Sequence, residues 1–101
     1  MLNLFTSSQL SLFCTARSGE TRLGQSVTLP APAAGLPQQL SQAAAAGCRY
    51  VLLGVPEDIG PRANLGLAGA DKGWQAFLTK FLNLQANDFI PAKQILLLGN
   101  I

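Results

Sequence analysis

Two short apolar runs constrain the fold of this chain more than any other feature. They are Tyr50-Val51-Leu52-Leu53-Gly54-Val55 and Gln94-Ile95-Leu96-Leu97-Leu98-Gly99. Neither run alternates polar with apolar residues, and this pattern is typical of a strand that is buried on both faces of a parallel sheet.

A helical stripe separates the two runs. Five of six positions spaced i, i+3, i+4, i+7, i+8 and i+11 are apolar, and the six are Trp74, Phe77, Leu78, Phe81, Leu82 and Gln85. The spacing predicts a helix over 73–86 with this stripe against a core. The order strand 50–55, helix 73–86, strand 94–99 therefore predicts a βαβ unit with a right-handed crossover and parallel strands.

The first half of the chain is predicted to contain extended segments, a connector and one helix. Residues 10–29 are expected to be extended, because Leu10, Leu12 and Cys14 alternate with other residues, and a hairpin with 26–29 is one arrangement. Residues 30–37 form a connector rich in Pro, Ala and Gly, and 38–46 favour a helix. Gly47 is expected to end that helix as a C′ glycine.

The composition indicates that this sheet is incomplete. The chain is 49% hydrophobic and only 12% charged, whereas about 25% is usual. Two parallel strands that are apolar on both faces also need further strands and covering helices. We therefore expect residues 1–101 to be one opening segment of a larger α/β domain, with 38–99 carrying helix, strand, loop, helix and strand. The alternative is a self-sufficient domain whose sheet is completed by the 10–29 hairpin.

Charge and targeting patterns exclude several partners. A net charge of +2 predicts no binding to nucleic acid or to a membrane surface, and no apolar run approaches the ~20 residues of a membrane span. Without a signal peptide pattern, the protein is expected to be cytoplasmic, with Cys14 and Cys48 as free thiols, although one disulfide remains possible. The expected partners are the remainder of the α/β domain or another protein chain, including a homo-oligomer.

A glycine-rich segment after the first strand resembles a known family. It reads PEDIGPRANLGLAGADKG over 56–73, after a strand that ends in Gly-Val-Pro, and RSGETRLG lies upstream at 17–24. This order of motifs resembles the N-terminal portion of the arginase/agmatinase/formimidoylglutamase (ureohydrolase) family, and is most similar to the formimidoylglutamase-like branch. Position 67 is Leu, where close relatives usually carry Arg.

The resemblance implies a three-layer α/β/α parallel-sheet fold and a hydrolase that cleaves C–N bonds of linear amidines. Family members bind two manganese ions through histidines and aspartates, and a metal-bridging hydroxide attacks the amidine carbon. This chain has no histidine, and Asp58, Asp71 and Asp88 lack the family's ligand spacing. No catalytic or metal-binding residue therefore transfers to it. The chain alone is predicted to be inactive, and manganese and an amidine substrate are expected only for a full-length relative.

Four residues of the loop are candidates for binding the substrate. Arg62 could pair with a substrate carboxylate, and Asn64 could contact the substrate or simply shape the loop. Glu57 and Asp58 follow the strand directly and could contact a substrate amine or support a metal ligand. Their simpler role is to cap a turn or to pair with Arg62.

The loop glycines Gly66, Gly69 and Gly73 could suggest a phosphate-binding loop. Their spacing matches neither the dinucleotide-binding nor the P-loop pattern, so tight turning and close packing of helix on sheet explain them better. Two functional hypotheses follow. The chain is part of a manganese-dependent C–N hydrolase, or it is a truncated, non-catalytic relative that acts only by association through an exposed sheet edge.

Overall fold

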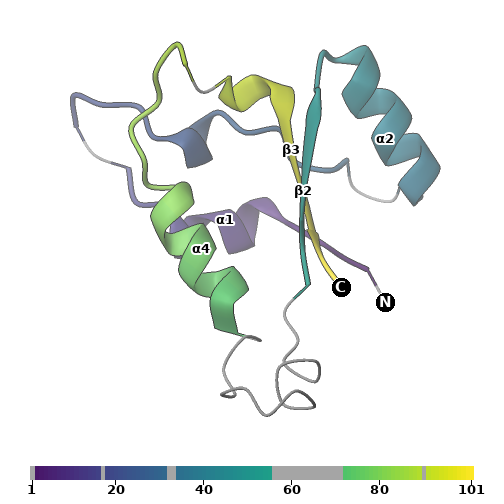
Figure 1. Cartoon of the computed structure of the whole chain (residues 1–101), viewed down its shortest axis with the longest axis horizontal. Coiled ribbons are helices and arrows are strands. Elements are labelled where there is room, and N and C mark those ends of the chain that lie inside the picture. The colour runs from purple at the N-terminus through teal and green to yellow at the C-terminus, as the bar shows by residue number, and fades with distance from the viewer. Residues whose placement is uncertain (1, 17, 32–33, 56–71, 90) are drawn as a thin grey trace.

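A three-stranded sheet organises the chain, with the strand order β1, β3, β2 (Figure 1). β2 (Tyr50–Gly54) and β3 (Ile95–Asn100) are parallel, which confirms the predicted parallel pair. β1 (Asn3–Leu4) joins the other edge of β3 in the antiparallel sense, so the sheet is mixed. The computed structural model describes the whole chain except residues 1, 17, 32–33, 56–71 and 90.

Helices cover both faces of this sheet (Figure 1). On one face, α1 (Ser7–Phe13) and α4 (Gly73–Phe81) pack around a buried cluster of Phe5, Leu78, Leu82 and Leu97. On the other face, α2 (Leu36–Ala45) places Ala43 against Leu96 and Leu98 of β3. The described residues thus form a small mixed α/β structure, in which helix, sheet and helix lie in successive layers.

The segment 7–13 is a helix, so the prediction of an extended chain is wrong where it overlaps this helix, at 10–13. Thr6 and Gln9 form a capping box: the Gln9 N–H donates to Thr6 Oγ1 over 3.2 Å, and the Thr6 N–H donates to Gln9 Oε1 over 3.0 Å. Such a pair satisfies two N–H groups that a helix start leaves free, and it outweighs the weak alternation of Leu10 and Leu12.

The hairpin that was one possible arrangement of 10–29 does not form, because Thr28 pairs with the central strand instead. The Thr28 N–H donates to the Ile95 carbonyl, and the Leu97 N–H donates to the Thr28 carbonyl, each over 2.9 Å. This single parallel bridge and β1 follow each other along one edge of β3, and together they place β3 in the interior of the sheet.

α2 ends as the sequence predicts. Gly47 has a φ of +99°, the Gly47 N–H donates to the Ala44 carbonyl, and the Cys48 N–H donates to the Ala43 carbonyl. These two bonds make a Schellman motif, which satisfies carbonyls that the last turn leaves free. The helix itself covers Leu36–Ala45, two residues earlier at its start than predicted.

α4 is shorter than the sequence predicts, and β2 is less buried than predicted. α4 ends at Phe81 rather than at 86, and Gln85 instead forms a bridge with Arg22. β3 is buried along five of its six residues, as predicted for a strand covered on both faces. β2 is not: it is an edge strand, and three of its five residues are exposed, so the prediction of burial on both faces is wrong for it within this chain.

Neither thiol is cross-linked. Cys14 and Cys48 are both half-buried free cysteines. Within the described part of the chain, no helix has the length and apolar character needed to cross a bilayer.

Candidate functional site

The carboxyl ends of β2 and β3 meet at one end of the sheet, at the bottom of Figure 1. Parallel α/β sheets bind their ligands at this end of the strands. The Ile101 N–H donates to the Gly54 carbonyl over 2.9 Å, which ties the two strand ends together. Asn3 lies opposite Asn100 in the ladder, so the start of the chain reaches the same end.

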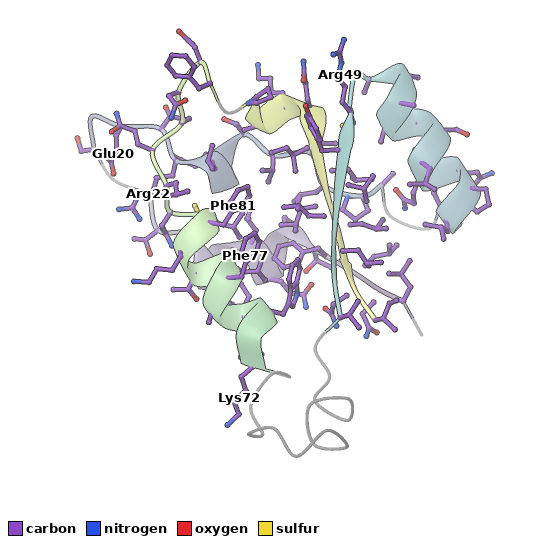
Figure 2. All side chains as sticks on the ribbon, viewed as in Figure 1. Glu20, Arg22, Arg49, Lys72, Phe77 and Phe81 are labelled. Carbon is purple, nitrogen blue, oxygen red and sulfur yellow. The ribbon has the colours of Figure 1, made fainter. Side chains whose placement is uncertain are left out.

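The first turn of α4 is fixed against the end of β2. The Trp74 indole lies directly over Gly54: a Cβ added to this glycine would lie 2.5 Å from Cε2 and 2.7 Å from Cε3 of the ring. The indole also stacks on Phe77, with ring centroids 5.8 Å apart. Lys72 precedes this turn, is exposed, and extends from the same end of the molecule (Figure 2). Gly54 therefore allows the helix to approach the strand closely at the candidate site.

The predicted close-packing role belongs to Gly54 and not to Gly73. A Cβ added to Gly73 would meet no atom within 4 Å, so close packing does not require a glycine there. Gly66 and Gly69 lie outside the described residues. The sequence alone does not reveal this role of Gly54, because Gly54 is one of ten glycines and simply ends an apolar run.

All four predicted substrate-binding residues fall in the segment 56–71, outside the described residues: Glu57, Asp58, Arg62 and Asn64. Leu67 falls there too. The structure therefore describes what flanks this segment, namely the end of β2 and the start of α4. Among the described residues, no group of three or more His, Cys, Asp or Glu side chains could hold a metal ion.

A polar network that the sequence did not predict lies away from this end of the sheet. Arg22 Nε forms an ion pair with Glu20 Oε1 at 3.2 Å, and its Nη1 donates to Asn83 Oδ1 over 2.5 Å. The Asn83 amide group donates in turn to the carbonyls of Phe13 and Thr79. Figure 2 places Arg22 and Glu20 far from Lys72, so this network joins the α1 end, the 20–25 segment and the α4 end rather than lining the candidate site.

Gln39 is a second polar residue that sequence reasoning missed. Its side chain is buried, accepts a hydrogen bond from the Ala31 N–H over 2.8 Å, and donates to the carbonyls of Ala31 and Ala34. Gln39 thereby joins the connector to α2. A helix-favouring Gln among several others carries no sequence signal for such a role.

One pocket of about 410 Å³ contains charged residues, and it lies at the amino end of β3 rather than at the carboxyl end. Asp88 and Lys93 contribute to its lining, and both are exposed. It therefore lies at the opposite end of the sheet from the carboxyl end of β2.

The outer edge of β2 is open in the described structure. Its apolar side chains are largely exposed: 55% for Tyr50, 48% for Val51, 42% for Leu53 and 59% for Val55.

Comparison with protein-family models, with curated proteins and with solved structures finds no match for this chain.

Proposed function

We propose that this chain supplies sheet framework and one wall of the substrate cleft in a formimidoylglutamase-like C–N hydrolase. The observation that carries the proposal is the parallel pair β2–β3, with helices on both faces and with segment 56–71 following β2 at the carboxyl end. That is the end at which α/β enzymes bind their substrates.

In this proposal, Arg62 binds a carboxylate of a linear amidine substrate through its planar fork of N–H groups. Asn64 shapes the loop or contacts the substrate. Glu57 and Asp58 contact a substrate amine or support a metal ligand, or else cap a turn or pair with Arg62. A dinuclear manganese centre would activate water for attack on the amidine carbon. The chain contains no histidine, and within its described residues no group of three His, Cys, Asp or Glu side chains could hold a metal ion, so hydrolysis is not assigned to these 101 residues.

The transcript beyond codon 101 tests this proposal directly. We expect an open reading frame with Gly-Gly-x-His and Asp-x-His-x-Asp segments. In the encoded protein, Arg62→Ala should raise KM for the amidine at least about tenfold, because a charged hydrogen bond contributes roughly 1.5–3 kcal/mol. Arg49→Ala, an exposed change at the amino end of β2, is the matched control and should leave KM unchanged. A stop codon directly after Ile101, or equal KM values, would contradict the proposal.

The second candidate function is association without catalysis. The open edge of β2 and its exposed apolar side chains favour it. Calorimetric titration of the 101-residue chain with Mn²⁺ should then show no tight binding, and a tight isotherm for two ions would contradict it.

A further inference from the structure

β3 contains a bulge near the carboxyl end of the sheet. The register between β2 and β3 shifts between Leu52 and Leu53, and Leu98 is left without a partner residue in β2. An extra residue of this kind exchanges the faces on which the following side chains lie. Bulges are frequent next to active sites, where they redirect a side chain. The side chain that this bulge redirects is Asn100.

Two neighbours place the Asn100 side chain on the face covered by α4. In β2 it lies opposite Gly54, which lies under the Trp74 indole. In β1 it lies opposite Asn3, and the next residue, Leu4, packs on the α2 face. Paired residues on adjacent strands share a face, and consecutive residues alternate. Without the bulge, alternation along β3 would instead place Asn100 on the α2 face.

Three side chains with uncharged N–H donors come together at this position. Asn3 and Asn100 lie directly opposite each other, so their Cβ atoms are about 4.5–5.5 Å apart. The indole Nε1 of Trp74 is bonded to Cε2, which lies over Gly54, so the indole N–H is close to the same pair. Among the described residues, none of the three side chains has a hydrogen-bond partner. Asn3 is exposed and the other two are half-buried, so a ligand can reach all three.

We propose that Asn3, Asn100 and the Trp74 indole N–H bind a carboxylate group at the carboxyl end of the sheet. The indole can only donate, and each carboxamide supplies two further N–H groups against one oxygen, so the site offers more donors than acceptors. An ionised carboxylate accepts hydrogen bonds at about four positions on its two oxygens. It can therefore bond to all three side chains at once.

The charged side chains described at this end also favour an anion. Lys72 is exposed and extends from the same end of the molecule (Figure 2). The acidic side chains among the described residues lie elsewhere: Glu20 pairs with Arg22, and Asp88 lies beside the pocket at the amino end of β3. The proposed site uses neither Arg62 nor a metal ion, so it does not depend on the hydrolase assignment.

Side-chain NMR signals test the site in the wild-type sequence, so the test does not require any variant to fold. The probe is sodium glutarate, titrated at constant ionic strength, with Ile101 amidated so that its α-carboxylate does not compete. The signals of both carboxamides and of the single tryptophan should shift together. We expect one dissociation constant in the millimolar range, because uncharged hydrogen bonds at an open site contribute little each. The Gln38 carboxamide, exposed on α2, should not shift.

Asn100→Asp should weaken glutarate binding at least about tenfold, because it removes two N–H donors and places a like charge beside the ligand. Gln38→Glu is the matched control: it makes the same amide-to-carboxylate change on the other side of the sheet, and should leave the dissociation constant unchanged. Absent shifts, shifts with different dissociation constants, equal losses in both variants, or tighter binding of acetamidinium than of glutarate would each overturn the proposal.

Discussion

Replacing Gly54 with Ala tests whether the Trp74 indole fixes α4 against the carboxyl end of β2. The added Cβ would approach Cδ2 of the ring most closely and would lie 2.5 Å from Cε2, whereas ordinary contacts begin at 3.4 Å. The indole must therefore retreat by about an ångström or slightly more. It cannot do so freely, because it packs against the buried cluster and stacks on Phe77.

The expected cost follows from two opposing effects. Overpacking of this kind costs about 1–3 kcal/mol. Gly54 does not have a positive φ, so alanine fits the strand and recovers about 0.5–1 kcal/mol of backbone entropy. We expect Gly54→Ala to lower the free energy of unfolding by about 1–2 kcal/mol, which corresponds to a Tm decrease of roughly 5–15 °C.

Stability is measured by urea unfolding followed by far-ultraviolet circular dichroism. Tryptophan fluorescence would not serve, because Trp74 is the single tryptophan and is replaced by alanine in the double-mutant cycle described next. Gly73→Ala is the matched control: it adds a methyl group next to Trp74 along the chain, but meets no atom within 4 Å. Because the same gain in backbone entropy applies at the start of α4, that control should leave stability unchanged or raise it by up to about 1 kcal/mol, and should not lower it.

A double-mutant cycle identifies the cause of the loss. In a Trp74→Ala background the added methyl group has no ring to displace, so Gly54→Ala should be neutral or slightly stabilising. If Gly54→Ala costs the same with and without the indole, the contact between Gly54 and Trp74 does not explain the cost, and the reasoning about how α4 is positioned fails.

Three further stability predictions use the same unfolding assay. Gly99→Ala should cost about 2–4 kcal/mol, because Gly99 has a φ of +146° and a Cβ there would meet the Asn3 carbonyl oxygen; a loss below that of Gly54→Ala would contradict this. Gly47→Ala should cost only about 1 kcal/mol, since it has positive φ but no atom within 4 Å, and a larger loss would point to an unrecognised contact. Gln39→Ala should cost about 1–3 kcal/mol by leaving the buried bonds to Ala31 unmade, whereas the exposed Gln38→Ala should be near neutral; equal effects would argue against that role.

Local patterns predicted the βαβ part of the fold well. The stripe around Leu78 and Leu82 identified α4, and both residues are buried. The run from Ile95 to Leu98 identified a strand buried on both faces, and Gly47 marked the end of α2. These features depend on periodicity and on the conformational freedom of glycine, both of which are visible in a single sequence.

The failures have identifiable physical causes. Apolar alternation over five residues predicts an extended chain where α1 lies, but the Thr6–Gln9 capping pair is the stronger determinant in so short a segment and starts a helix instead. The bridge between Thr28 and Leu96 joins residues far apart in the sequence, and no local pattern encodes such a pairing. The contacts of Gln39 and Arg22 are likewise set by tertiary packing. For the candidate site, the sequence proposed Glu57, Asp58, Arg62 and Asn64, and these remain predictions because the described residues only flank them.

β2 and β3 show why an apolar pattern does not determine burial. Their sequences are similarly apolar, yet β3 is buried while Val51 and Leu53 of β2 remain nearly half exposed. The difference lies in their neighbours: β3 has strands on both edges, and β2 has one only on its inner edge within the described structure. Fully burying a Val or Leu side chain contributes about 1.5–3 kcal/mol, so covering the exposed halves of these two would contribute roughly 1–3 kcal/mol in total. That unrealised stabilisation favours any strand that completes the edge. It is the physical basis for expecting a longer α/β sheet, as in the proposed hydrolase.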